Sequence, residues 1–264
     1  VVASLNSSWA LSPAETGFLL SAGLFGMLCG AIVAGPLADR FGRKAIFQWT
    51  LFFFSVFSLA SAYVPQGQVA MLAVCRFLVG VGLGGETPVV VSLLGEFVPS
   101  KHRGKVQGLL TPFWGVGWRP PAAIAFFFIP NLGPDSFAAY IVPGGEGWRI
   151  AFISGALPAL YIFYIRRKLP ESPRWLAGKG RMDEALKIVE NIENEVAKCH
   201  ADLPPVNEAD VIRFSNQPPK LPISTLFKGQ YLRRTLVLWS FWGFGMAGFY
   251  GLFAWLPSLL NKMG

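Results

Sequence analysis

Three charged side chains, Glu86, Arg119 and Arg76, lie inside long apolar stretches, where a charge is costly and usually has a function. Glu86 lies ten residues before Glu96, and Arg119 lies fourteen residues after Lys105. With a helix rise of 1.5 Å per residue, Glu86 lies about 15 Å from Glu96 and Arg119 about 21 Å from Lys105. Glu96 and Lys105 border the same basic loop, 96–105. We expect Glu86 and Arg119 at similar depth, where a carboxylate can take up a proton and a guanidinium can bind an anion.

Two tryptophans accompany Arg119. Trp114 and Trp118 are four residues apart, so a helix places them on one face, next to Arg119. Indole rings beside a guanidinium form a platform for a flat aromatic anion, although tryptophans of this kind can also serve packing alone. Two prolines directly after Arg119, at 120 and 121, disturb a regular helix at this point. Our candidates for a substrate and proton pathway are Glu86, Arg119, Trp118 and Trp114.

Six apolar segments have to position these residues. They cover about 16–38, 45–64, 68–95, 105–130, 148–166 and 235–260. The 264-residue chain is 53% hydrophobic and 14% charged, whereas soluble domains carry about 25% charged residues. Each segment approaches the roughly 20 apolar residues that a bilayer-spanning helix needs. Because hydrocarbon does not tolerate an open sheet edge, we predict an all-α, polytopic membrane helix bundle.

The net charge of +8 is distributed unevenly between the loops. Basic residues gather in 39–44, 96–105 and 166–234, whereas 63–69 carries no charge and 131–147 carries only Asp135 and Glu146. The positive-inside rule places the basic loops in the cytoplasm, so we expect a multi-pass protein of the cell membrane. Charge spread along one membrane face does not favour nucleic-acid binding.

Residue types that would indicate catalysis are scattered. The three cysteines (Cys29, Cys75 and Cys199) and the two histidines have no metal-ligand spacing, so we expect no metal and no cofactor. The chain shows no nucleophile paired with a base and no phosphate-binding loop, so we do not expect an enzyme. The string GVGLGG before Glu86 lies within an apolar segment, where small residues favour close helix packing.

The charged turn GPLADRFGRK, residues 35–44, separates the first two apolar segments. We expect Gly35 and Pro36 to end the first of them. Asp39 lies near the C-terminal end of a helix, where the helix dipole disfavours an anion. It therefore needs an Arg or Lys partner from the same turn or from a neighbouring helix. The positive-inside rule explains the basic residues of the turn, because they set the orientation in the membrane. It does not explain the acidic Asp39.

Three motifs together resemble the major facilitator superfamily. Gly35, Leu37, Asp39, Arg40, Gly42, Arg43 and Lys44 match its loop between spans two and three. Glu96 and Arg103 resemble the E-x6-R after span four of its sugar-porter branch, and PESPRWL, residues 170–176, resembles the signature after span six. GGETP, FWGVGW and GWRIAF are similar to the niacin and aromatic-acid transporters of this superfamily.

The resemblance implies a secondary active transporter that works by alternating access. We expect proton-coupled uptake of a small organic acid such as nicotinate, by a protein that is monomeric when full length. A sugar:proton symporter and, in a different class, a non-transporting receptor or scaffold are the alternatives. The resemblance also implies a cytoplasmic network that latches two helix bundles in the outward-facing state, formed by Asp39, Arg43, Glu96, Arg103, Glu171 and Arg174.

The predicted organisation has three parts. Residues 1–168 form an N-terminal transmembrane bundle containing spans two to six, and 231–264 contain the first span of a C-terminal bundle. Residues 169–230 form a cytoplasmic linker, in which Ala185, Val189 and Ile192 mark the apolar stripe of a surface helix. A partner-binding motif is the alternative for this helix. By the resemblance, we expect one span before residue 1 and the remainder of the second bundle after residue 264.

Overall fold

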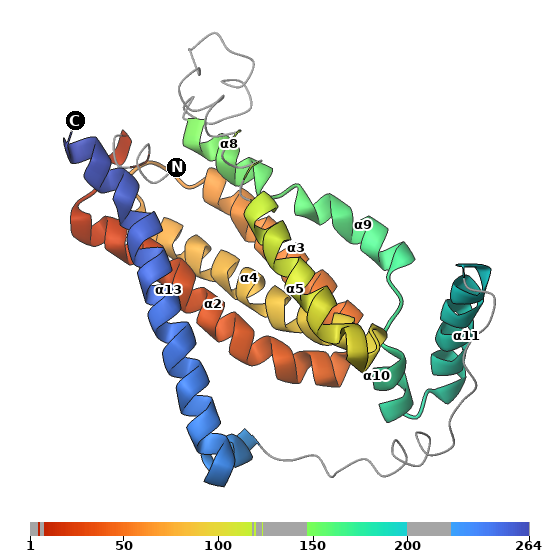
Figure 1. The fold of residues 1–264 in the computed structure, drawn as a ribbon. Coiled ribbons are helices and arrows are strands. Elements are labelled where there is room, and N and C mark those ends of the chain that lie inside the picture. The colour runs from red at the N-terminus through yellow and green to blue at the C-terminus, as the bar shows by residue number, and fades with distance from the viewer. Residues whose placement is uncertain are drawn as a thin grey trace. The chain divides into compact units, whose positions relative to one another are not determined.

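The computed structural model describes residues 5, 8–117, 119, 123, 147–199 and 223–263. Every regular element in these ranges is a helix, which confirms the all-α prediction (Figure 1). The chain divides into two compact units, Val1–Glu195 and Val196–Gly264. The three-part organisation stays a prediction.

Three long helices form the centre of the first unit and confirm the first three apolar segments. They are α2 (Pro13–Phe41), α3 (Arg43–Ala62) and α4 (Val69–Phe97). Helix α2 begins with a capping box: the Ser12 hydroxyl accepts from the Glu15 N–H at 3.2 Å, and the Glu15 carboxylate accepts from the Ser12 N–H at 2.8 Å.

Helix α2 does not end at Gly35 and Pro36, so that prediction is wrong. The helix continues through Pro36 to Phe41. A proline inside a helix removes one backbone hydrogen bond and favours a kink, but the flanking turns can continue. The chain turns at Gly42, whose φ of 104° is in the region that favours glycine.

Glycines bring α2 and α4 into backbone contact. A Cβ atom on Gly26 or Gly30 of α2 would overlap the carbonyl oxygen of Phe77 or Val81 of α4. From the other side, Gly80 and Gly84 of α4 press against Gly23 and Met27 of α2, as the GVGLGG string predicted. Helices in lipid associate through such close packing because hydrocarbon supplies no hydrophobic driving force between them.

Of the next two predicted spans, one is described only in part and the other forms two helices. Helix α5 (Ser100–Gly117) covers the start of the 105–130 segment, and most of its remainder lies outside the described residues. The 148–166 segment forms two helices, α8 (Gly147–Ser154) and α9 (Pro158–Lys168), which both pack on α3. The break coincides with Gly155, where a Cβ would overlap the Ser58 hydroxyl, and with Pro158 at the start of α9.

One helix was predicted in the linker, residues 169–230. The described part of this segment up to residue 199 has two, α10 (Pro173–Gly178) and α11 (Met182–Cys199). The second unit contains the short 3-10 helix η2 (Ile223–Phe227) and α13 (Gly229–Met263). The Thr235 hydroxyl donates to the Leu226 carbonyl at 3.1 Å and so ties η2 to α13.

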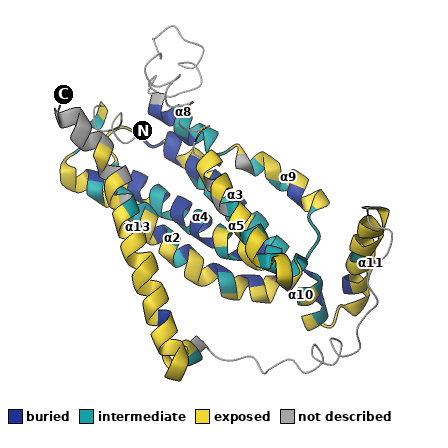
Figure 2. Ribbon diagram, viewed as in Figure 1, coloured by how far each residue is buried: buried dark blue, intermediate teal, exposed yellow. Residues whose placement is uncertain are grey.

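Four helical segments in the described residues are long and apolar enough to cross a membrane: Pro13–Phe41, Arg43–Ala62, Val69–Phe97 and Trp148–Lys168. Large apolar side chains are exposed along them, among them Phe25, Trp49 and Phe163 (Figure 2). Such a surface is suited to lipid and not to water. The predicted span at 235–260 lies within the single helix α13, and its crossing of the membrane stays a prediction.

A buried cluster joins α3, α4 and α8 at the end of the bundle opposite Gly42. Leu72, Val64 and Trp148 are almost fully buried there. The Arg149 guanidinium donates to the carbonyl oxygens of Ala62 at 2.6 Å and Val64 at 2.9 Å. A cation at a helix C-terminus stabilises the carbonyl groups that the helix itself leaves without partners.

The glycine packing predicts a specific loss of stability. Gly26→Ala places a methyl group against the Phe77 carbonyl and should destabilise the protein by about 1–3 kcal/mol, the usual cost of overpacking. The thermal unfolding midpoint in detergent measures this effect. Gly17→Ala is the matched control in the same helix, because a Cβ there meets nothing within 4 Å. Equal midpoints for the two variants would contradict the proposed importance of the α2–α4 contact.

Candidate functional site

Arg43 is the centre of the charged network at the Gly42 end of the bundle. Its Nη2 atom lies 2.7 Å from Asp39 Oδ1 and 3.2 Å from Glu96 Oε1, and its Nη1 donates to the Ala38 carbonyl at 3.0 Å. Asp39 thus has the basic partner that its position near a helix C-terminus requires. Because Arg43 and Glu96 are only 13% and 12% exposed whereas Asp39 is 73% exposed, the pair with Glu96 is the less hydrated one.

Glu171 joins the network through backbone groups. Its Oε1 atom accepts from the N–H groups of Arg43 at 3.0 Å, Lys44 at 3.1 Å and Ser172 at 3.0 Å. The N–H groups of Arg43 and Lys44 belong to the start of α3, where the helix dipole favours a negative charge. The carboxylate also occupies the space that a side chain on Gly42 would need. Glu171 is therefore an N-terminal cap of α3.

Trp175 is a member of the network that the sequence reasoning missed. Its indole Nε1 donates to the Asp39 carbonyl at 2.9 Å. Ser172 caps α10 by accepting from the Trp175 N–H at 3.2 Å, and this cap fixes the tryptophan in place. The sequence S-P-R-W carries the signal, because a serine followed by proline is typical of a helix start.

Two predicted members of the network are not paired. Arg103 packs beside Gly95, and its buried Nε has no hydrogen-bond partner. The Glu96 Oε2 atom is also buried without a partner. Arg174 is exposed, and no ion pair involves it within the described ranges. The structure therefore brings together Asp39, Arg43, Glu96 and Glu171, and it leaves two arginines outside.

Glu86 lies in α4 directly after the glycines that contact α2 and α3. Gly84 presses against Met27 of α2, and residues two apart are about 200° apart around a helix, so Glu86 is turned away from α2. Its side chain is partly buried, and no hydrogen bond or ion pair to its carboxylate is found among the residues that the structure describes. An unpaired carboxylate in an apolar helix is suited to reversible protonation.

Of the other candidate pathway residues, Arg119 is the one whose side chain is described. Arg119 is exposed and lies just beyond the last residue of α5, Gly117. Trp118 and the side chain of Trp114 lie outside the described residues. The convergence of these three residues with Glu86 stays a prediction.

Arg76 of α4 connects the helices near the opposite end. The Nη2 atom of Arg76 donates to the Ser61 hydroxyl of α3 at 3.2 Å, and its guanidinium carbon lies 4.2 Å from the centre of the Phe152 ring of α8. A guanidinium over an aromatic face is stabilised by the ring quadrupole. Arg76 therefore has a packing role in this structure. Among the described residues, no group of three potential ligands for a metal ion is found.

Long apolar helices, a partly buried carboxylate within one of them and a rim of basic residues at one end define a polytopic membrane protein. Residues 3–263 match the model of the "Sugar (and other) transporter" family, so the chain belongs to this family. It is a multi-pass protein of the cell membrane.

Proteins of known function match over the whole chain. The niacin transporter NiaP of Acinetobacter baylyi is 41% identical over 100% of this chain and 55% of its own length. The 4-hydroxybenzoate transporter PcaK of Pseudomonas putida is 33% identical over 100% of this chain and 54% of its own. The xylose transporter XylE of E. coli, solved in a partially occluded inward-open conformation, has a TM-score of 0.64 at 25% identity and covers 76% of this chain and 51% of XylE. The chain spans about half the length of these relatives.

The network predicts unequal effects for the two carboxylate partners of Arg43. Arg43→Ala leaves Glu96 buried without its cation and should cost about 3 kcal/mol of unfolding free energy, as for other broken buried pairs. Asp39→Asn removes an exposed carboxylate and should cost less than about 1 kcal/mol. Thermal unfolding midpoints compare the two variants, with Lys101→Ala as an exposed control. A larger loss for Asp39→Asn than for Arg43→Ala would contradict this assignment.

Proposed function

We propose that the whole protein is a secondary active transporter that takes up a small organic acid, such as nicotinate or another aromatic carboxylate, together with a proton. The observation that carries this proposal is the 41% identity with a niacin transporter over the entire chain. The similarity to a 4-hydroxybenzoate transporter supports the same substrate class, because niacin and 4-hydroxybenzoate are both flat aromatic acids. Transport, not catalysis, is the activity that we infer.

Glu86 is the group that we assign to the proton. It follows Gly84 and Gly85 in α4, and the close contacts of these glycines with α2 and α3 fix this part of the helix. Protonation neutralises the carboxylate and removes the cost of a buried charge. Arg119, with Trp114 and Trp118 on the same predicted helix face, is assigned to the substrate, with its guanidinium on the carboxylate and the indoles on the ring.

The cytoplasmic network is assigned to the change between the two orientations. Asp39, Arg43 and Glu96 hold α2, α3 and α4 together, whereas Arg103 and Arg174 are available for groups of a second bundle. Exposed ion pairs contribute about 0–1 kcal/mol each. Such weak pairs are suited to a latch, because substrate binding has to shift the equilibrium by only a few kcal/mol. The transporter is proposed to work as a monomer.

A sugar:proton symporter is the second candidate. The PESPRWL motif and the similarity to the xylose transporter favour it. The few amide side chains in the predicted spans disfavour it, because sugar hydroxyl groups need many hydrogen-bonding partners. A non-transporting scaffold is disfavoured by Glu86, since a scaffold has no use for an unpaired carboxylate in a membrane helix.

Uptake measurements test this assignment. The whole protein, in proteoliposomes with an inward proton gradient, should accumulate labelled nicotinate or benzoate but not glucose. Glu86→Gln should abolish gradient-driven accumulation, and Arg119→Ala should weaken acid binding, because each removes the charge proposed for that step. Glu190→Gln, a change at an exposed carboxylate of α11, is the control. Full accumulation by Glu86→Gln would overturn the proton assignment, and accumulation of glucose alone would favour the sugar symporter.

The latch has its own test. Arg103→Ala should slow uptake while leaving the amount of inserted protein and its unfolding midpoint unchanged, because Arg103 makes no ion pair within the described bundle. Initial uptake rates at saturating substrate measure the effect, with Lys101→Ala as the exposed control two residues away. Rates equal to those of the unchanged protein would contradict a latch role for Arg103.

A further inference from the structure

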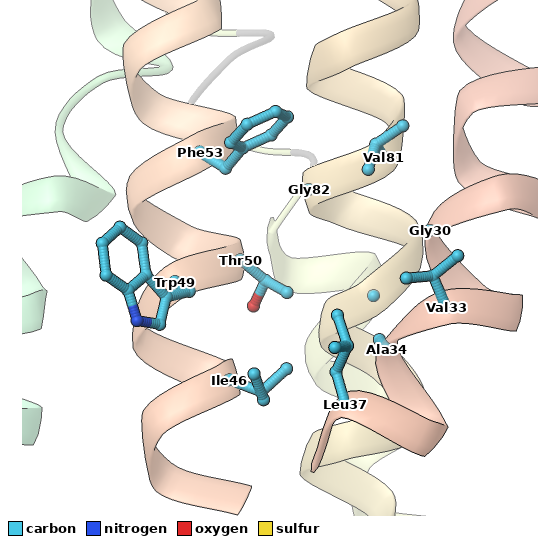
Figure 3. A pocket seen from close by; sticks show the side chains of 11 residues that line it. Gly30, Val33, Ala34, Leu37, Ile46, Trp49, Thr50, Phe53, Val81 and Gly82 are labelled. Carbon is cyan, nitrogen blue, oxygen red and sulfur yellow. The ribbon is translucent and has the colours of Figure 1, made fainter. Parts of the chain in front are cut away.

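An apolar groove of about 160 Å³ lies between α2 and α3, with α4 as its floor (Figure 3). Val33 and Leu37 line it from α2, Ile46 and Phe53 from α3, and Val81 and Gly82 from α4. It exists because α2 and α3 each pack mainly on α4 and contact one another little. Glycines of α4 at the floor add no side chains that could fill it.

The lining is mostly apolar, and its polar side-chain groups are the Trp49 indole N–H and the Thr50 hydroxyl. Its only hydroxyl belongs to Thr50, and this hydroxyl donates to the Phe47 carbonyl of its own helix at 2.9 Å. An apolar cavity without free polar groups does not hold water. Figure 3 shows Ile46 and Thr50 of α3 pointing across α4 toward Leu37 of α2. Glu86 is not among the residues that line the groove, whereas its neighbour Gly85 is.

Large apolar side chains at the rim are exposed. Val33 is 52% exposed and Trp49 is 64% exposed, and both lie in helices that are long and apolar enough to cross the membrane. In a membrane protein, such side chains contact lipid, so the groove opens toward acyl chains. A flexible chain that fills it gains the packing contacts that the lining atoms otherwise lack.

A cation stands at the basic end of the groove. Arg40 follows Val33 and Leu37 at helical spacing, so the three lie on one stripe of α2. Arg40 is exposed, its guanidinium carbon lies 5.3 Å from the centre of the Phe41 ring, and no ion pair involves it within the described ranges. An apolar groove that ends at an exposed guanidinium is complementary to an amphiphile with an anionic head.

We propose that this groove binds one acyl chain of a phospholipid from the leaflet at the Arg40 end, with the lipid phosphate held by Arg40. The bound chain fills the space between α2 and α3. This site depends on the membrane setting and not on the identity of the transported solute.

Photolabelling tests the acyl-chain part. The whole protein is placed in nanodiscs that contain phosphatidylglycerol with a diazirine in one acyl chain, and adducts are mapped by mass spectrometry. We expect adducts on Val81, which a chain reaches through the groove. Val33→Trp should reduce these adducts about tenfold, because the indole displaces roughly two methylene groups of the chain. Ile32→Trp, at a 64% exposed neighbour outside the lining, should not change them.

Two comparisons test the phosphate part. Diacylglycerol with the same labelled chain should label Val81 about fivefold less than phosphatidylglycerol, the effect of one cation near the membrane surface. Arg40→Ala should remove this difference, and Arg167→Ala, at an exposed cation of α9, should preserve it. Equal labelling by both lipids in the unchanged protein would overturn the phosphate contact.

The remaining outcomes concern other occupants. If Val81 receives no adduct while exposed residues such as Phe25 and Ile32 do, a protein segment fills the groove and the proposal is wrong. Equal labelling of Val81 in the Val33→Trp and Ile32→Trp variants would show that the label reaches α4 by another path, which also overturns it. Unfolding midpoints of both variants verify that each protein is folded.

Discussion

The backbone packing of α2 on α4 is the contact on which the rest of the described bundle depends. In hydrocarbon, two apolar helix surfaces gain nothing by leaving lipid for one another, so association has to come from close packing. Glycines supply it from both sides, with Gly26 and Gly30 facing Phe77 and Val81. This approach brings the charged end of α2 beside Glu96 of α4, and it leaves α3 to pack over α4 at a distance from α2, where the groove forms.

The charged network separates into a fixed part and an open part. Glu171 and Trp175 hold backbone groups at the α2–α3 turn, and such bonds do not depend on a second bundle. Arg43 compensates the charge of Glu96 where little water is present, so the loss of Arg43 should lower the stability of the protein. Arg103 and Arg174 make no ion pair among the described residues. The residues that the sequence groups into one network therefore differ in the partners that the described structure gives them.

Local sequence patterns predicted several features correctly. They failed where a contact with a residue far away in the sequence determines the structure. The first three spans were found because apolar length is a local property, and a basic partner for Asp39 was expected because Arg43 lies only four residues away. The end of α2 was misplaced, because Pro36 is tolerated within the packed helix. Trp175 and Arg149 were missed, since they contact residues 136 and 87 positions away, respectively. Glu171 was expected in the cytoplasmic network without an assigned partner, and its carboxylate accepts from backbone N–H groups at the start of α3.

The sequence by itself determined that the chain is helical, that it belongs in a membrane and which loops carry the positive charge. These properties follow from composition and from the cost of unpaired backbone groups in hydrocarbon, and no distant contact can change them. Only the tertiary structure decided which charge meets which partner and where a groove remains. The physical reason is that hydrogen bonds and packing act over a few ångströms, and the helix crossings decide which residues come within that distance.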